Sequence, residues 1–490
     1  MQRGNSSVVW TAGIFTLIYC SISLVNHLQY RTSALDLGMF NQALYAISHV
    51  RAPLFTLSED GQIYPFLSCH FDFICFLYAP LQFIFGSYTL LLIQIAAIIL
   101  GGLGIYRYAK PMFANGSHIP LLLLIHFFGI WGIYSALAFD FHNNVIAAML
   151  VPWLAIAMRE RKPWLTLLLV LLILSNKEII ALWTIFIVLC FGLCNWQGIR
   201  SFCKLELPLM LLCLVFGIVV IMLIQPALQG SEVNLQMERY AHLGQSLPDV
   251  LMHFVSHPID ALSTLCTNTL NDSSYDYIKL ETALMLLISG GFMTIFAPKY
   301  LIMIIPILLW KFMSNSYWFW GINSQCSIEF VPAIMLATAH ALHKIRRGQL
   351  ALSISGCVLA AASTIYTMEN RQSKWYDYDN TAFYNAKHYR PKINPITTRQ
   401  VIKHYIPADC PVSASSTLTP HLYNRQHLYL FPVINNADYV AVVRQLYNYP
   451  ISVEDANKRV AELIDSGNYA VEFENNDIII LKSTSLHASD

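Results

Sequence analysis

Apolar runs long enough to cross a lipid bilayer recur along the first 370 residues, and they constrain the fold more than any other feature. A transmembrane helix needs about 20 apolar residues. On that measure the sequence predicts about eleven transmembrane helices. They lie near residues 8–27, 88–106, 119–137, 143–158, 163–175, 179–195, 205–225, 281–297, 299–314, 324–342 and 349–367. The first run is longer than the apolar part of a signal peptide and has no small-residue cleavage site, so we expect it to be retained.

Composition agrees with a membrane protein. The 490 residues are 56% hydrophobic and 12% charged, whereas soluble domains average about 25% charged residues. The net charge of +1 argues against a nucleic-acid partner. Most of the 11 cysteines lie inside apolar runs, where they are expected to be small core residues. The sequence therefore predicts an all-α polytopic membrane protein.

Basic residues indicate how the predicted helices are oriented, because cytoplasmic loops carry an excess of lysine and arginine. The basic residues gather at alternate ends of the runs, and an N-terminus in the cytoplasm places all of these clusters inside. Counting residues 70–85 as a further span would break this agreement, so we expect that segment to be re-entrant or to lie on the membrane surface. The predicted outside loops include 28–87 and the long loop 227–280.

The long apolar runs stop near residue 370. We therefore expect a transmembrane domain at 1–370 and a small soluble α/β domain at 371–490, outside the cytoplasm. The turn Glu474-Asn475-Asn476-Asp477 is a hairpin signal. The predicted elements of this domain are helices near Thr398–Tyr405 and Val453–Ser466, and strands at Val412–Ala414, His427–Leu430, Asp438–Val443, Ala470–Glu474 and Asp477–Leu481.

Ionisable residues gather at the outer ends of the predicted helices. Ionisable groups near a bilayer are costly and usually face the protein interior or a wet cavity. Their position on one membrane face predicts a site that opens outward, whereas a transporter would place them near the midplane in two related halves. The candidates are Asp36 and His70 in the first loop, Asp140 and His142 in "AFDFHNN", Lys177 and Glu178 in "SNKEII", and Glu238, Arg239 and His242 in the long loop.

Each candidate has a purely structural alternative. Asp36 would suit the N-cap of the following helix, and His142 would suit a backbone hydrogen bond at the interface. Lys177 and Glu178 would suit an interfacial ion pair, and Arg239 a contact with lipid phosphates. The segment "CHFD" has no strong zinc spacing, so no metal site is predicted; a divalent metal is possible in such a protein but has no support in the sequence.

Several segments in order carry a resemblance to a known family. They are "ALDLGMFNQALY", "CHFDFICFLYAPLQFIFG", "AFDFHNNVIAAMLVPWLAIAM", "SNKEIIALW", "EFVPAIMLATAHAL" and "CPVSASSTLTPHLYNRQHLYLFP". Together they resemble the membrane family called domain of unknown function 2079 (DUF2079), across nearly the whole chain. That family in turn resembles the GT-C superfamily of membrane glycosyltransferases, which includes protein mannosyltransferases and the aminoarabinose transferases of lipid A. This second resemblance rests on the layout of the chain and on one acidic residue.

The GT-C resemblance implies a fold and an activity. Such enzymes have a long first outside loop with an acid soon after the first span, and Asp36 falls there. Asp36 stands without the adjacent second carboxylate of some members, which argues against a metal-assisted version. Asn143 and Ile179 stand where family members commonly have Pro and Asp. The implied activity is transfer of a sugar from a polyprenyl-phosphate donor to an acceptor on the extracytoplasmic face, with inversion.

The resemblance also implies roles for the candidate residues. Asp36 would be the general base, since a carboxylate in a partly apolar loop has a raised pKa. Lys177 and Arg239 would face the leaving phosphate, with His70 and His142 as hydrogen-bond donors. Asp140 and Glu178 complete the expected substrate-binding set.

The expected partners are a polyprenyl-phosphate-linked sugar, an unidentified glycan, lipid or protein acceptor, and membrane lipids, in a bacterial inner membrane. No cofactor is predicted with certainty. Two other function classes stay open: a transporter or flippase of lipid-linked or cell-envelope precursors, and a non-catalytic scaffold that presents the C-terminal domain. In the scaffold the outer ionisable residues would not converge in one cavity.

Overall fold

The computed structural model describes residues 2–229, 238–270, 272–374, 376–447 and 449–487. Parts of the predicted loop 227–280 and of the predicted domain 371–490 lie outside these ranges. Contacts divide the chain into two compact units: Met1–Cys20 with Gln94–Ala382, and Ser21–Ile93 with Phe383–Asp490. The first outside loop therefore belongs to the same unit as the C-terminal region. The predicted domains 1–370 and 371–490 concern placement in a membrane, which stays a prediction.

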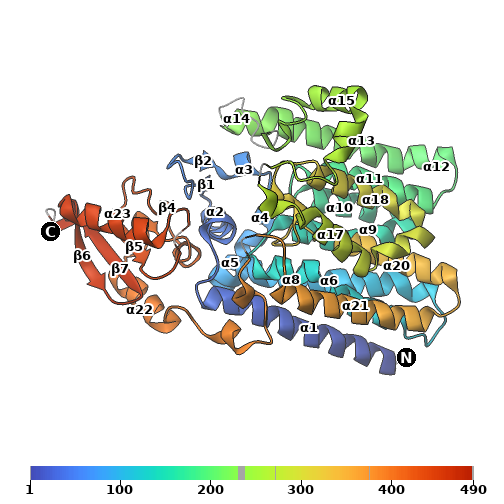
Figure 1. Cartoon of the computed structure of the whole chain (residues 1–490), viewed down its shortest axis with the longest axis horizontal. Helices are drawn as coiled ribbons and strands as arrows, with labels where there is room; N and C mark the ends of the chain where they lie inside the picture. Colours follow the sequence, from blue (N-terminus) through green and yellow to red (C-terminus); the bar gives the residue numbers. More distant parts are fainter. Residues whose placement is uncertain (1, 230–237, 271, 375, 448, 488–490) are drawn as a thin grey trace. The chain divides into compact units, whose positions relative to one another are not determined.

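The first unit is helical (Figure 1). It contains most of α1 (Gln2–Leu28) and of α6 (Thr89–Ala109). Its other helices are α7 (Ile119–Gly129), α8 (Trp131–Ala138), α9 (Asn143–Arg159), α10 (Pro163–Leu174), α11 (Ile180–Cys194), α12 (Ile199–Lys204), α13 (Glu206–Val219), α14 (Gln225–Gln229), α15 (Leu247–Ser256), α16 (Pro258–Ser263), α17 (Ile278–Ile288), α18 (Leu301–Phe312), α19 (Tyr317–Trp320), α20 (Phe330–Ile345) and α21 (Gln349–Glu369).

Every predicted span contains an α-helix, but the count of about eleven spans is not confirmed. Among the described residues, four helical segments are long and apolar enough to cross a membrane: Ser6–Leu28, Cys75–Met112, Glu206–Gln229 and Gln349–Glu369. The pair α7 and α8 would add a fifth span, bent by 40° at a break where Ile130 is extended. The apolar helices α9, α10, α11 and α20 have 10 to 17 residues, fewer than a straight span needs.

Residues 70–85 do not form one regular helix. They contain two short α-helical turns, α4 (Cys75–Tyr78) and α5 (Gln82–Phe85), joined by a tighter turn at Ala79–Leu81. Pro80 lies in that tighter turn, where it lacks an N–H to continue a helical ladder. These turns run on into α6 within the apolar segment that ends at Met112, and the surface-lying or re-entrant placement of 70–85 stays a prediction.

Small residues let the helices of the first unit pack closely. A Cβ added to Gly101 would lie 2.5 Å from the sulfur of Met149, and one on Gly102 would lie 2.3 Å from the Phe128 ring. α6 therefore approaches α9 and α7 through glycines, which is a common way for membrane helices to gain contact. Thr364 on α21 donates to the carbonyl oxygen of Gly129 on α7 over 2.7 Å.

The second unit contains a five-stranded sheet with the order β4-β3-β5-β7-β6. β3 (Val412–Ala414) is parallel to β4 (Leu428–Leu430) and to β5 (Tyr439–Val443), whereas β7 (Ile478–Ser483) is antiparallel to β5 and to β6 (Tyr469–Glu474). All five predicted strands are confirmed. Both predicted helices are confirmed as well, as α22 (Pro395–Tyr405) and α23 (Val453–Asp465).

Alternate residues of the sheet face its two helices. On β5, Ala441 and Val443 join the buried cluster that contains α22, whereas Val440 and Val442 join the cluster that contains α23. Figure 1 shows these helices on opposite sides of the sheet. The parallel strands β3, β4 and β5 are therefore buried on both faces, as expected when helices cover parallel strands.

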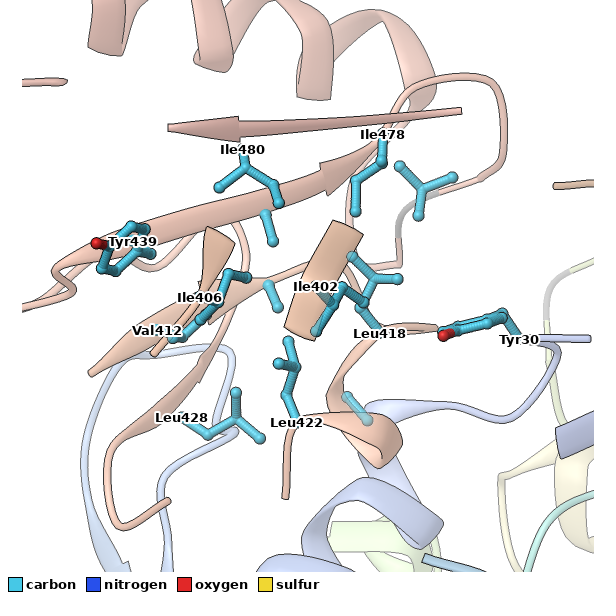
Figure 2. Packing of buried hydrophobic residues seen from close by; sticks show 14 of the residues in the cluster. Tyr30, Ile402, Ile406, Val412, Leu418, Leu422, Leu428, Tyr439, Ile478 and Ile480 are labelled. Carbon is cyan, nitrogen blue, oxygen red and sulfur yellow. The ribbon is translucent and has the colours of Figure 1, made fainter. Parts of the chain in front are cut away.

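The first outside loop packs against the α22 side of this sheet. Tyr30, Ala34 and Leu57 belong to the same buried cluster as Leu418 and Leu422, and Figure 2 shows Tyr30 at the edge of this cluster, on the side where Leu418 lies. The loop carries α2 (Met39–Ser48), the strands β1 (Leu54–Phe55) and β2 (Tyr64–Pro65), and α3 (Phe66–Cys69), and the unit ends with α24 (Thr484–His487). Hydrophobic burial thus joins the segment around Asp36 to the C-terminal domain.

Candidate functional site

Asp36 lies in a distorted turn, Ala34–Gly38, directly before α2. Its backbone has φ 93° and ψ −95°, a left-handed conformation that a residue with a side chain rarely adopts. Such a conformation costs about 1–3 kcal/mol and is found mostly at functional sites. Gly38, directly before α2, already has helical φ and ψ, and Asp36 is the last non-helical residue before it, so the alternative that Asp36 caps this helix stays open.

The turn is fixed by bonds within itself and by the C-terminal domain. Ser33 Oγ donates to the carbonyl oxygen of Leu35 over 2.8 Å, and the Gly38 N–H donates to the carbonyl oxygen of Ser33 over 3.0 Å. Ser416 Oγ accepts the N–H of Ala34 over 3.0 Å. The surrounding structure thus holds Asp36 in its strained conformation.

Two further polar side chains lie near Asp36. The Tyr449 hydroxyl donates a hydrogen bond to the Glu59 carboxylate, and Tyr449 also interacts electrostatically with Asp36. Burial, and then the bond to Glu59, raise the pKa of Tyr449, so its hydroxyl stays protonated at neutral pH. The C-terminal domain therefore contributes Tyr449 to the surroundings of the predicted base, with its hydroxyl proton donated to Glu59.

In the first unit, a buried glutamine holds the turn that carries Asp140 and His142. Gln94 Nε2 donates to the Asp140 carbonyl oxygen over 2.8 Å, and Gln94 Oε1 accepts the His142 N–H over 3.0 Å. His142 Nδ1 donates to the carbonyl oxygen of Phe141 over 2.6 Å, so the expected backbone bond of this histidine is present. The sequence-based prediction did not include Gln94. The signal that could have pointed to it is a single amide side chain in the apolar run "TLLLIQIAAIIL".

A buried ion pair that the sequence analysis missed lies close to this turn. Lys311 Nζ is 3.2 Å from Glu329 Oε2, and both side chains are at most 3% exposed. Asn144 Nδ2 donates to the other carboxylate oxygen over 3.0 Å. Lys311 and Glu329 are the only Asp, Glu, Lys or Arg residues between 301 and 343, and isolated charges in such apolar sequence were the available signal.

Three cationic side chains lie within electrostatic range of the buried Cys326. Lys177, Arg239 and Lys311 all interact electrostatically with this residue, together with the Glu329 carboxylate. The Arg239 guanidinium lies 4.6 Å from the centre of the Phe319 ring, and Lys311 Nζ lies 5.9 Å from the same ring. The structure therefore brings Lys177 and Arg239, the predicted phosphate partners, into one neighbourhood. We call Lys177, Arg239, Lys311 and Glu329 the cation cluster.

The seven predicted site residues divide between the two units. Asp140, His142, Lys177, Glu178 and Arg239 belong to the first unit, and Asp36 and His70 belong to the second. Asp140, His142 and Glu178 are buried, as expected of groups that face a protein interior. Convergence of Asp36, His70, His142, Lys177 and Glu178 in one outward-facing pocket stays a prediction. Within the described ranges, no group of three or more His, Cys, Asp or Glu residues is placed to hold a metal ion.

Solved structures show what the fold is similar to. The crystal structure of ArnT from Cupriavidus metallidurans bound to undecaprenyl phosphate aligns with a TM-score of 0.54 and 11% identity, over 97% of each chain. The apo structure of ArnT from the same organism gives 0.53 and 10%, over 98% of each chain. At this identity the likeness carries the fold alone, and it confirms the GT-C-like architecture that the sequence resemblance implied.

A third solved structure and two sequence comparisons give results of different strength. The cryo-EM structure of the arabinofuranosyltransferase AftD from Mycobacteria has a TM-score of 0.46 and 13% identity, over 97% of this chain and 40% of AftD. No curated protein matches the sequence. A family model described as "Predicted membrane protein (DUF2079)" matches residues 26–480. The chain therefore belongs to the DUF2079 family of membrane proteins.

Proposed function

We propose that the protein is an integral membrane glycosyltransferase that moves a sugar from a polyprenyl-phosphate donor to an acceptor on the extracytoplasmic face. The observation that carries this proposal is the cation cluster, in which Lys177, Arg239 and Lys311, the last paired with Glu329, all interact electrostatically with the buried Cys326 on a GT-C-like fold. Such a cluster suits a group that gains negative charge, as a lipid phosphate does when its bond to a sugar breaks. The neighbour ArnT was crystallised with undecaprenyl phosphate, which fits this donor class.

The reaction is a single displacement. An acceptor hydroxyl attacks the anomeric carbon, Asp36 takes the hydroxyl proton, and the bond from the anomeric carbon to the phosphate oxygen breaks. The leaving polyprenyl phosphate keeps the electron pair of that bond, and the new glycosidic bond has the opposite anomeric configuration. Asp36 is proposed as the base because the chain holds it in a strained turn, which the hydrogen bond from the Ala34 N–H to Ser416 Oγ helps to fix.

The other predicted residues have supporting roles in this proposal. His70 and His142 donate hydrogen bonds to the donor, and Asp140 and Glu178 bind substrate hydroxyls. The same proposal includes the orientation of the chain: the N-terminus lies in the cytoplasm and the C-terminal domain lies outside the cytoplasmic membrane. This orientation puts Asp36, the cation cluster and the C-terminal domain on the side where lipid-linked sugars are used.

Mass spectrometry of lipid-linked sugars and envelope glycans tests the proposal in cells. A deletion strain is expected to accumulate one polyprenyl-phosphate sugar and to lose one sugar modification. A plasmid copy of the wild-type chain restores both signals, and a copy that carries Asp36→Asn does not. Identical lipid-linked sugar and glycan profiles in the wild-type and deletion strains would overturn the proposal.

A further inference from the structure

A deep groove lies between helices in the first unit, away from the residues assigned so far. It has a volume of about 480 Å³, within the range of ligand-binding sites, and is lined by α17, α18 and α20. Its walls are almost entirely apolar, with Leu280 and Leu287 on α17, Ile304 and Leu308 on α18, and Ile334 on α20. Because these helices lie in predicted spans, the groove is suited to a hydrocarbon chain.

One charged side chain lines this groove, that of Lys279 at the start of α17. It is only 3% exposed. Its ammonium donates to the carbonyl oxygens of Thr264 and Thr267, the second over 2.8 Å, and lies 4.1 Å from the centre of the Trp320 ring. None of these partners carries a full negative charge. No carboxylate within the described parts of the chain forms an ion pair with Lys279.

A buried cation without a carboxylate partner is costly, because its desolvation is not offset by an opposite charge. An anion beside Lys279 would supply that charge, and a phosphate does so with charge-assisted hydrogen bonds. The apolar walls and the buried ammonium are therefore complementary to the two ends of one molecule, a hydrocarbon chain that ends in a phosphate.

We propose that this groove binds a single-chain isoprenoid phosphate, with its chain between α17 and α18 and its phosphate on the Lys279 ammonium. The choice of an isoprenoid lipid rests on the proposed function, whereas the groove and its buried cation do not. A phospholipid offers similar head-group chemistry but two chains. The groove is also distinct from the cation cluster, because none of the four residues of that cluster lines it.

Binding to the purified full chain in detergent tests this inference without any sugar transfer. The probes are a short polyprenyl phosphate, the matching polyprenol, inorganic phosphate and phosphatidylglycerol. Lys279→Met is expected to weaken polyprenyl phosphate binding about 10- to 100-fold, the usual loss for a charged hydrogen bond, and to leave polyprenol binding unchanged. Lys279→Arg keeps the charge and most of the affinity.

A second pair of variants tests the groove itself. Ala283→Trp fills the groove and is expected to abolish binding of both polyprenyl lipids, whereas Leu284→Trp, on an exposed neighbouring residue outside the groove, leaves both unchanged. Wild-type affinity in both Lys279→Met and Ala283→Trp would overturn the inference, as would phosphatidylglycerol or inorganic phosphate that displaces polyprenyl phosphate at equal concentration. If binding behaves as expected but no sugar is transferred, the proposed function is wrong, whereas the inference that the groove binds an isoprenoid phosphate is upheld.

Discussion

Asp36 combines a strained backbone with a side chain suited to proton transfer. A φ of 93° with ψ −95° is strained for any residue with a side chain, and asparagine, which matches aspartate in shape, meets the same strain. This makes the asparagine variant an informative test, because it changes the chemistry while the conformation remains accessible.

Asp36→Asn is expected to keep folding and membrane insertion and to reduce the rate of sugar transfer by about 10²–10⁴-fold, the usual effect of losing a general base. Asp36→Ala is expected to lose activity as well and to keep a similar stability, because alanine meets the same backbone strain as aspartate. Transfer rates and thermal unfolding of both variants separate the two effects. Full activity in Asp36→Asn would exclude Asp36 as the base.

A second prediction at the scale of single residues concerns the contribution of the buried Lys311–Glu329 pair to stability. Glu329→Gln keeps an acceptor for Asn144 but leaves the Lys311 cation buried without its counter-charge, so a loss of about 3–5 kcal/mol is expected. The double variant Lys311→Met, Glu329→Gln removes both charges and should recover most of that loss. Thermal unfolding in detergent measures both. Equal destabilisation in the single and double variants would contradict the ion-pair account.

At the scale of elements, the turn around Asp36 and the C-terminal domain form one packed structure. A Cβ added to Gly38 would lie 2.8 Å from Thr419 Oγ1 and 3.3 Å from Leu57 Cδ1. The close approach between the turn and the segment after β3 therefore depends on glycine. The domain outside the predicted membrane region thereby helps to set the position of the proposed base.

Gly38→Ala is expected to push the turn away from Thr419 and to cost about 1–3 kcal/mol, as overpacking does, with a lower transfer rate. Thr419→Ala removes the obstructing hydroxyl, so the double variant Gly38→Ala, Thr419→Ala should regain activity that Gly38→Ala alone loses. Thr419→Ala alone is the control, because this substitution also removes the hydrogen bond from Thr419 Oγ1 to the Ser416 carbonyl oxygen. Failure of the second substitution to restore any activity would contradict this contact.

Local patterns predicted the elements but not their partners. The turn at 474–477 predicted the last hairpin, because the signal for such a turn lies in neighbouring residues. The packing of Tyr30 and Leu57 on that sheet joins residues more than 300 positions apart, which no local pattern encodes. Lys311 and Glu329 were missed for the same reason: each is a single charge in its own apolar run, and only the fold brings them together.

At the scale of the whole molecule, the basic clusters predict that the C-terminal domain lies outside. In a chain whose native cysteines are replaced, Glu472→Cys is expected to react with a membrane-impermeant thiol reagent added to intact cells. Arg346→Cys, in a predicted cytoplasmic loop, is expected to react only after the membrane is opened. Both positions are exposed, so burial does not protect them. Protection of Glu472→Cys in intact cells would contradict the proposed orientation.

The most direct test of the central claim is the release of polyprenyl phosphate by the purified protein. Vesicles that contain the wild-type chain, a polyprenyl-phosphate sugar and an envelope extract as acceptor source are expected to release polyprenyl phosphate with time. Vesicles with Asp36→Asn should release it about 10²–10⁴-fold more slowly. If the wild-type chain releases no more polyprenyl phosphate than empty vesicles with every donor supplied, the protein is not a glycosyltransferase of this class.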